Sequence, residues 1–396
     1  MKPAWVRWSL TVSLALGMGA FPFSTRAQQT EPAPPHAPAA GKVLTLEEAI
    51  AIALERQPQI QARVSDWEAA KARVNQALAP LLPQLGSSWA ATRTQSVTQR
   101  TTGGRLQTNF NWDTANTLKG TLSQKLFDFG KAFAATDQAK ANAESSRQDV
   151  ELQKDLIILA VKESYFNILF SQRLVKVNQQ ALERAELNLR SAKGFHEVGT
   201  RPKSEVTRAE VDVANARLKI IQAKNAVRLA RAALNTAMGI PVDSPTELKG
   251  TLAYEPFPVD QPRLVSEALS QRPEYRQIKA QVEAAEAGAR QAFRNFFPDL
   301  TGDAYVGTTK ADMNEIWELG VTLKWDIFDG GSKIAKYREA KAVVEAAKAR
   351  VSALELEIWK EVEQAHSDLI ETEERIQAAQ ASVASAQENF KLAQGR

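Results

Sequence analysis

The chain has 396 residues, of which 44% are hydrophobic and 24% charged, and its formal net charge is +4. It contains no cysteine, which excludes disulfides, thiolate metal sites, cysteine nucleophiles and a lipid-bearing N-terminal cysteine. Three histidines, His36, His196 and His366, are too few to suggest a histidine metal cluster.

Residues 1–27 have the pattern of a secretory signal peptide. Lys2 and Arg7 precede an apolar stretch over 8–23, and Ala27 ends a small-residue cleavage site. A membrane anchor is the alternative, although the apolar run is short for one. Removing the segment takes away three basic and no acidic residues, lowering the net charge from +4 to +1, so nucleic-acid binding is not supported.

Residues 28–43, rich in Pro and Ala, predict a flexible linker. Thr45 then begins a capping box, and helical periodicity runs to about Ala79 with a break near Pro58. After Ala27 no apolar run is long enough for a transmembrane helix, so helical membrane spans are not expected.

The sequence contains an internal repeat. Residues 53–85 align without a gap on 268–300, with eleven identities in 33 positions, and a second register links 122–194 to 323–395. This predicts two similar units, 44–250 and 251–396, that pack against copies of themselves. The first unit continues roughly 44 residues beyond the last matched position, so we expect the chain to be truncated before its last helix and the functional protein to have at least ~440 residues.

Each unit is expected to contain one β-hairpin, at about 85–127 and 300–328. The first hairpin loop, around Gly103-Gly104, is expected to be 14 residues longer than the second. Apolar and polar residues alternate over 316–328, which is the period of a strand with one apolar face. That face carries Trp317, Leu319, Val321, Leu323, Trp325 and Ile327.

Long helices are predicted at about 131–194, 203–238 and 332–394. The first and last lack proline and would each extend on the order of 90–100 Å, so they must pack as coiled coils. A Gly- and Pro-bearing turn over 194–202 reverses the chain between the first two.

Four amphipathic strands cannot close a barrel, so they either close between chains or form soluble hairpins. Two chains would give eight strands and three would give twelve, and only the larger barrel leaves a water path. Four tryptophans fit an interfacial aromatic girdle, although they could equally form the core of a soluble hairpin: Trp89, Trp112, Trp317 and Trp325.

Five motifs in order resemble those of the TolC family of outer-membrane efflux proteins. The match extends over nearly everything after Val43. It rests on the first helix at 44–58, the helix-to-strand junction at 81–85, the strand-to-helix junctions at 126–130 and 327–331, and the turn at 198–206.

This resemblance implies a mainly α-helical fold with a small β part. Three chains would form a twelve-stranded outer-membrane barrel that continues into an antiparallel coiled-coil tunnel in the periplasm. It also implies a passive homotrimeric channel in contact with outer-membrane lipid, docked through a periplasmic adaptor protein to an inner-membrane pump of the RND, ABC or MFS type.

The resemblance places adaptor docking at the turn between the long helices. Candidate docking residues are Val198, Gly199, Thr200 and Arg201, and the alternative is a purely structural turn in which the glycine supplies the unusual backbone angles. Glu205, at a position where the family often has aspartate, could line the periplasmic entrance or could simply be a solvated first-turn residue.

The Phe-Asp-x-Gly corners are interpreted as structural. Asp128 and Asp329 would cap the long helices, and Gly130 and Gly331 would allow the bend. His196 should face solvent, and His366, at the repeat position of Tyr165, should be a packing or lumen-facing residue.

No nucleophile–base constellation, phosphate-binding loop or metal spacing is present in the sequence, so neither enzyme nor cofactor is predicted. The leading hypothesis is an exit channel for efflux or type I secretion, and the alternative is an exported coiled-coil protein that bridges the periplasm without conducting. The sequence leaves the cargo open, and the family's gating residues would fall beyond Arg396.

Overall fold

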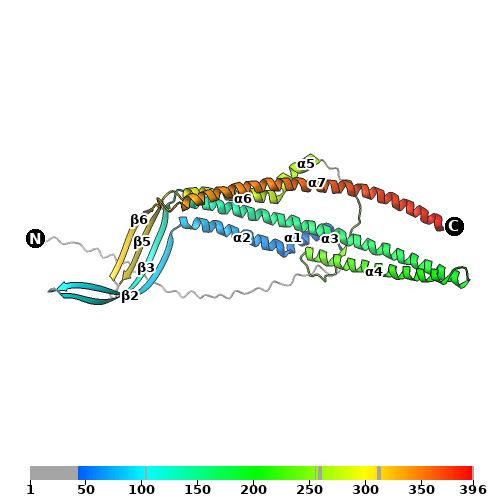
Figure 1. Cartoon of the computed structure of the whole chain (residues 1–396), viewed down its shortest axis with the longest axis horizontal. Helices are drawn as coiled ribbons and strands as arrows, with labels where there is room; N and C mark the ends of the chain where they lie inside the picture. The colour runs from blue at the N-terminus through cyan, green and yellow to red at the C-terminus, as the bar shows by residue number, and fades with distance from the viewer. Residues whose placement is uncertain (1–42, 103–104, 255, 257–260, 310–313, 395–396) are drawn as a thin grey trace.

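The computed structural model describes residues 43–102, 105–254, 256, 261–309 and 314–394 (Figure 1). The predicted signal peptide, residues 28–42 of the predicted linker, His36 and Gly103-Gly104 lie outside the described residues. The molecule is long and narrow, with the strands at one end and the long helices running away from them (Figure 1).

The first helical segment breaks at a proline, as predicted. Strand β1 (Val43–Leu44) leads into α1 (Leu46–Arg56), and Pro58 begins α2 (Pro58–Leu78). Thr45 forms the predicted capping box: its Oγ1 accepts from the Glu48 N–H at 3.3 Å, and its own N–H donates to Glu48 Oε2 at 3.1 Å. Proline at the first helical position has no N–H to satisfy, so it starts α2 without loss.

A four-stranded antiparallel sheet forms one end of the molecule, in the order β2-β3-β5-β6. Its strands are β2 (Gln84–Thr102), β3 (Arg105–Phe127), β5 (Asp299–Thr309) and β6 (Asn314–Lys324). The two hairpins join through the β3–β5 pair, so segments far apart in sequence share one surface.

The helices form layered antiparallel packing. They are α3 (Lys131–Glu197), α4 (Lys203–Ala237), α5 (Gln261–Gln271), α6 (Pro273–Arg294) and α7 (Ser332–Gln394). Helix α3 lies at the centre and packs against α2, α4 and α6, whereas α7 packs mainly on α6. With 67 residues, α3 is about 100 Å long.

Two separate apolar cores hold the helices together. The larger one surrounds Tyr165 on α3, whose hydroxyl donates to the Lys249 carbonyl at 2.6 Å, close to the parallel pair of β1 with β4 (Glu247–Leu248). The smaller one joins α5, α6 and α7 and contains Val265, Tyr275, Ile358 and Val362. His366 is half-buried on α7, outside both clusters.

Two predicted boundaries were wrong. The extra residues of the first hairpin do not form a longer loop: they lengthen the strands, which stay paired up to Thr102 and Arg105. The strand predicted to run to 328 ends at Lys324, because the Trp325 indole N–H donates to the Phe296 carbonyl at 3.1 Å and the chain turns there. Trp325 and Ile327 therefore lie beyond the sheet.

Candidate functional site

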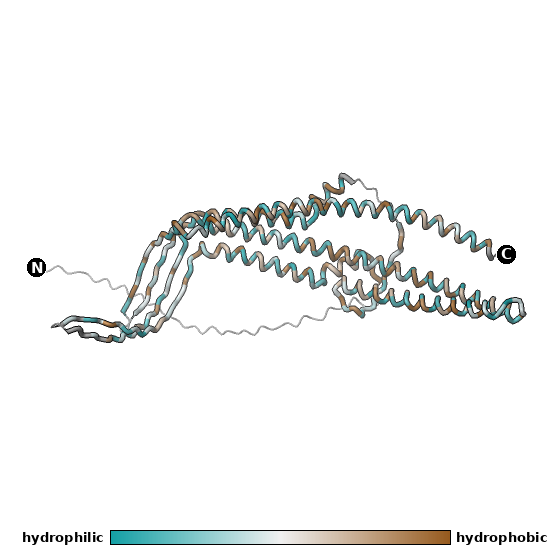
Figure 2. The backbone as a smooth tube through the Cα atoms, viewed as in Figure 1, coloured by the Kyte–Doolittle hydropathy of each residue, from teal (hydrophilic) through white to brown (hydrophobic). Residues whose placement is uncertain are grey.

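The sheet has one apolar and one polar face. Cross-strand partners share a face, so the pairing of Trp89 with Leu118, of Leu118 with Thr308, and of Val306 with Trp317 defines the apolar side. Trp112, six residues before Leu118, lies on the same side. Apart from the half-buried Thr308, these side chains are exposed, and Trp317 keeps 74% of its surface accessible. Hydrophobic and hydrophilic residues interleave along the strands in Figure 2.

The opposite face carries charged and hydroxyl groups. Ser123 donates to Asp303 at 2.7 Å across the β3–β5 pair, and the Lys119 ammonium lies 4.3 Å from the centre of the Tyr305 ring. Asp299 lies on this side at the end of the sheet nearest the helices. The sheet therefore has an exposed apolar face and a polar face opposite it.

Both outer strands of the sheet lack a neighbour among the described residues. β2 and β6 are at the two edges, so each presents a row of unpaired N–H and C=O groups along one side. Such edges are templates for pairing with another chain.

The corner between β3 and α3 holds a buried carboxylate, Asp128, and is closely tied to the second hairpin. Asp128 caps α3 twice, accepting from the Gly130 N–H at 2.9 Å and the Ala132 N–H at 2.8 Å. Phe129 and Gly130 both take left-handed backbone angles, with φ of 54° and 79°. Arg294 at the end of α6 donates to the Gly130 carbonyl.

Lys131 closes the same corner from the first turn of α3. Its ammonium donates to the Phe297 carbonyl at 2.8 Å and pairs with Asp299 at 2.9 Å, and only 13% of the side chain is exposed. Phe129 stacks on Phe297 with ring centres 5.2 Å apart. Sequence reasoning missed Arg294, Lys131 and Asp299 as corner residues, because their partners are more than 160 positions away.

The corner between β6 and α7 repeats the capping geometry in the open. Asp329 accepts from the Lys333 N–H at 2.9 Å, and Gly330 and Gly331 have φ of 69° and 87°. The Lys333 ammonium donates to the Asp326 carbonyl at 2.6 Å. Asp329 is exposed, unlike Asp128, which is 3% exposed.

The turn between α3 and α4 is a compact, rigid tip. Gly199 has φ of 77°, and Thr200 donates to the Phe195 carbonyl through both its N–H (2.9 Å) and its hydroxyl (2.7 Å). The Arg201 guanidinium stacks 5.0 Å from the Phe195 ring centre. Residues 198–201 are all exposed, Val198 by 71%, so the structure brings the four docking candidates together on one surface.

Two other sequence candidates lie beside the tip. His196 is exposed, as predicted, and its Nδ1 lies 2.9 Å from the Arg201 carbonyl. Glu205 is half-buried in the first turn of α4, where a carboxylate stabilises the helix N-terminus.

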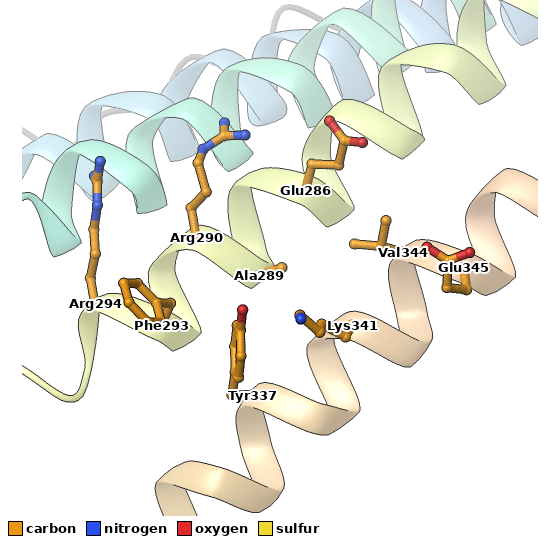
Figure 3. Close-up of a pocket in the computed structure, with 9 residues that line it drawn as sticks. All are labelled: Glu286, Ala289, Arg290, Phe293, Arg294, Tyr337, Lys341, Val344 and Glu345. Atoms are coloured by element: carbon orange, nitrogen blue, oxygen red, sulfur yellow. The ribbon is translucent and has the colours of Figure 1, made fainter.

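A pocket of about 660 Å³ lies between α6 and α7 (Figure 3). Phe293 and Tyr337 face one another with ring centres 5.6 Å apart, and the Lys341 ammonium lies 5.0 Å from the Tyr337 ring centre. Arg290 and Arg294 point away from α7 toward α3 (Figure 3). The sequence analysis did not single out this pocket. Its signal in the sequence is one aromatic residue near the end of α6 and another near the start of α7, which does not distinguish a pocket from ordinary packing.

The described residues contain no group of His, Asp and Glu side chains suited to a metal ion. No helix in the described part of the chain is long and apolar enough to cross a membrane.

Comparison with known proteins identifies the family. The profile of the family described as "Outer membrane efflux protein" matches residues 49–240 and 264–396. Among curated proteins, the alkaline protease secretion protein AprF of Pseudomonas aeruginosa is 28% identical over 73% of this chain, which spans 62% of AprF, less than two thirds of its length. The outer membrane protein TolC of Escherichia coli is 25% identical over 84% of this chain and 69% of its own.

A solved structure has the same fold. That of CusC, which describes "conformational changes accompanying folding and transmembrane channel formation", superposes with a TM-score of 0.74 at 18% identity, covering 88% of this chain and 81% of that one. The resemblance predicted from the sequence is confirmed, and the prediction that the chain is not an enzyme agrees with the family. The chain belongs to the outer membrane efflux protein family.

Proposed function

We propose that this chain is one protomer of a homotrimeric outer-membrane exit channel, with its sheet in the membrane and its long helices in the periplasm. The observation that carries this proposal is the sheet itself. Its apolar face, including Trp89 and Trp317, is exposed, and the outer edges of β2 and β6 have no partner strand among the described residues.

Closure with other copies accounts for both features. In lipid every backbone polar group needs a partner, so β6 of one protomer would pair with β2 of the next. Strands β5 and β6 are each 11 residues long, the length of a membrane-spanning strand, and β2 lies alongside them from Gln84 to Ala90. Three copies give twelve strands, enough to leave a water-filled interior lined by the polar face.

Tryptophans would mark both membrane surfaces. Trp112 lies five positions beyond the four-stranded sheet, on the extension of β2 and β3. Trp89 and Trp317 lie toward the end of the four-stranded sheet that is remote from the helices, and Trp325 lies at the helical end. Aromatic rings prefer the two interfaces of a bilayer, so these positions suit two girdles about one membrane thickness apart.

The helices would then form a tunnel. At about 100 Å, α3 is far longer than a bilayer is thick, and it starts directly at the inner end of the sheet. In this proposal the two predicted units, 44–250 and 251–396, contribute equivalent hairpins and coils, so three chains give a near-sixfold wall.

The tip between α3 and α4 is the proposed docking site for a periplasmic adaptor protein. Its rigid turn presents Val198, Gly199, Thr200 and Arg201 at the end farthest from the sheet (Figure 1). Preorganised apolar and cationic groups lower the entropy lost on binding. Through the adaptor, the channel would serve an inner-membrane pump of the RND, ABC or MFS type, and Glu205 would lie near the periplasmic entrance.

The family description and the name of AprF point to two different classes of cargo. An efflux family suggests small molecules, whereas the name of AprF concerns secretion of a protease. A passive duct can carry either, because the pump supplies the energy and selects the cargo.

Bilayer recordings test the channel. The full-length chain is purified from the outer-membrane fraction, its mass is measured in detergent, and it is reconstituted in planar bilayers. We expect trimers that form open pores. A monomer or dimer that does not conduct would instead favour the alternative, an exported coiled-coil protein that bridges the periplasm without forming a channel.

Docking at the tip is tested with paired variants. Val198→Asp places a charge on the exposed turn and should abolish adaptor crosslinking and export while leaving pores in bilayers intact. Lys203→Gln, at the start of α4, is the matched surface control and should leave both unchanged. Equal export by the two variants would contradict docking at this turn.

A further inference from the structure

Strands β2 and β3 continue well past the sheet that they share with β5 and β6 (Figure 1). Thr117 is the outermost residue of β3 that pairs with both neighbouring strands, with Ala90 of β2 on one side and Thr309 of β5 on the other. Beyond it, β2 and β3 form a two-stranded ribbon at the end of the molecule opposite the helices.

The face of the sheet that carries Trp89 and Leu118 continues onto this ribbon, where the pairs Ala91–Asn116 and Arg93–Thr114 separate it from a second apolar group. Val97 pairs with Phe110, and Trp112 pairs with Gln95, in the same alternation that places Trp89 opposite Leu118. Val97, Phe110 and Trp112 are each more than half exposed.

Arg93 is the only charged residue among the described side chains on this face of the ribbon. Its guanidinium lies 4.9 Å from the centre of the Trp112 ring. Asp113, the only acidic residue in the ribbon sequence, points to the opposite face, because it is the immediate neighbour of Trp112. This face of the ribbon therefore presents a stacked cation and aromatic groups, and the ribbon's one acidic residue lies on the other face.

In the proposed channel the hydrocarbon core would end near Ala90, where the four-stranded sheet ends, and Arg93 would lie in the headgroup layer. It lies three residues beyond Ala90, which is about 10 Å along a strand. Headgroups extend some 5–8 Å beyond each side of the hydrocarbon core, so a tilted strand places Arg93 among them.

We propose that Arg93 and Trp112 form a binding site for the phosphate-bearing sugar headgroup of an outer-leaflet glycolipid. This rests on the proposed function, which sets the sheet in the outer membrane with the ribbon outside. Arginine binds phosphate through a planar fork of donors, and the indole ring can hold that fork in place while packing against sugar and the first acyl carbons.

A neighbouring protomer offers a competing partner. Glu315 on β6 lies on the same face, at the level of Thr308 and Leu118, and β6 is an edge strand. If the edges close between copies, Glu315 of one chain could approach Arg93 of the next. The carboxylate is several residues nearer the membrane centre than Arg93, so we favour the lipid.

The test is native mass spectrometry of the full-length chain in detergent, titrated with bis-phosphorylated lipid A or with its dephosphorylated form. Arg93→Gln should weaken binding of the phosphorylated lipid about fivefold, the effect expected for one basic residue at an anionic surface. Lys119→Gln removes a cation that also stacks on an aromatic ring, but on the opposite face, and should leave binding unchanged. The wild-type chain should bind the dephosphorylated lipid as weakly as Arg93→Gln binds the phosphorylated one.

Three results would overturn the site. One is equal binding of both lipids by the wild-type chain, which needs no variant to fold. A second is an equal loss in Arg93→Gln and Lys119→Gln, which would indicate a nonspecific charge effect. The third is unchanged lipid binding with a lowered oligomer melting temperature in both Arg93→Gln and Glu315→Gln, which would assign Arg93 to the subunit contact. A conducting pore without Arg93-dependent binding refutes only this inference, whereas lipid binding without conduction refutes only the proposed channel.

Discussion

The two strand-to-helix corners have nearly the same sequence but very different surroundings. At the first corner, Asp128 is buried. Arg294 and Phe297, which precede the second hairpin in the chain, contact Gly130 and Phe129 of this corner. At the second, Asp329 makes the equivalent capping bond in solvent. The motif therefore specifies the backbone turn by itself, while the energy that holds the turn comes from its neighbours.

Among the described residues, no side chain at the second corner corresponds to Arg294 at the first. Arg294 ends α6, and the residue at its repeat position at the end of α2 is Ala79, which has no side chain that could reach a carbonyl. In the proposed trimer, the second corner would meet α2 and β2 of the next protomer. The difference between the corners should thus shrink on assembly.

Removing the capping carboxylates should give the largest contrast. Asp128→Ala leaves two N–H groups without an acceptor, one of them buried, and should lower the free energy of unfolding by about 2–3 kcal/mol. Asp329→Ala loses one exposed cap and should lower it by about 0.5–1 kcal/mol. Urea unfolding of the detergent-solubilised monomer, followed by circular dichroism, measures both.

Assembly provides the control for this pair. In the trimer the effect of Asp329→Ala should rise toward that of Asp128→Ala, because a neighbouring protomer would cover the second corner. Equal effects in the monomer would show that burial by Arg294 and Phe297 adds nothing to the cap.

Alanine at the two corner glycines separates backbone strain from packing. Both Gly130 and Gly331 are left-handed, so alanine should cost about 1 kcal/mol at either position. At Gly130 the added Cβ would also lie 2.8 Å from Arg294 Nη1, whereas nothing lies within 4 Å at Gly331. Gly130→Ala should therefore destabilise the protein by about 2 kcal/mol in total.

The variant Arg294→Met tests whether the additional destabilisation by Gly130→Ala comes from the close contact between the new Cβ and Arg294. In that background Gly130→Ala should fall to the value of Gly331→Ala, measured by thermal unfolding of the four variants as a double-mutant cycle. If the two substitutions add independently, the clash explanation is wrong.

Sequence periodicity predicted the elements because local patterns determine them. The capping box at Thr45, the break at Pro58 and the alternating faces around Trp317 all depend on residues within one turn or one strand. The predictions of the hairpin boundaries were wrong because these boundaries depend on pairing and contacts between distant parts of the chain. The repeat offset counted the extra residues correctly but could not tell a longer loop from longer strands, and the end of β6 depends on the contact of Trp325 with Phe296.

The candidate sites divide in the same way. The tip was predictable because Gly199, Thr200 and Phe195 interact within a few residues of one another. The roles of Arg294 and Lys131 depend on partners from the other half of the chain, so no local pattern could reveal them.

The two apolar cores between the helices allow the same kind of comparison, and here we expect the smallest differences in free energy of unfolding. Tyr165 is buried in the larger core and donates to the Lys249 carbonyl, whereas His366, at its repeat position, is half-buried outside the smaller one. Tyr165→Phe should therefore lower the free energy of unfolding by about 1 kcal/mol, the value of one neutral hydrogen bond, while His366→Phe should change it by less than about 0.5 kcal/mol.

The dependence on pH makes this last contrast sharper. Burial, and secondarily the charge of Glu47, raises the pKa of Tyr165 above its ordinary value near 10. A phenol with a raised folded-state pKa holds its proton more tightly when folded, so its contribution is complete below pH 10 and is lost as the pH rises from there through the raised pKa. Other tyrosines and lysines titrate in the same range, so the measurement is the difference between wild-type and Tyr165→Phe unfolding curves from pH 7 to 11.5. The difference in free energy of unfolding between the two chains should be constant up to about pH 9.5 and then narrow, because only the wild-type chain has a buried phenol at this position to ionise. A difference that stays constant through pH 11 would mean that the hydroxyl stabilises the core without being desolvated there.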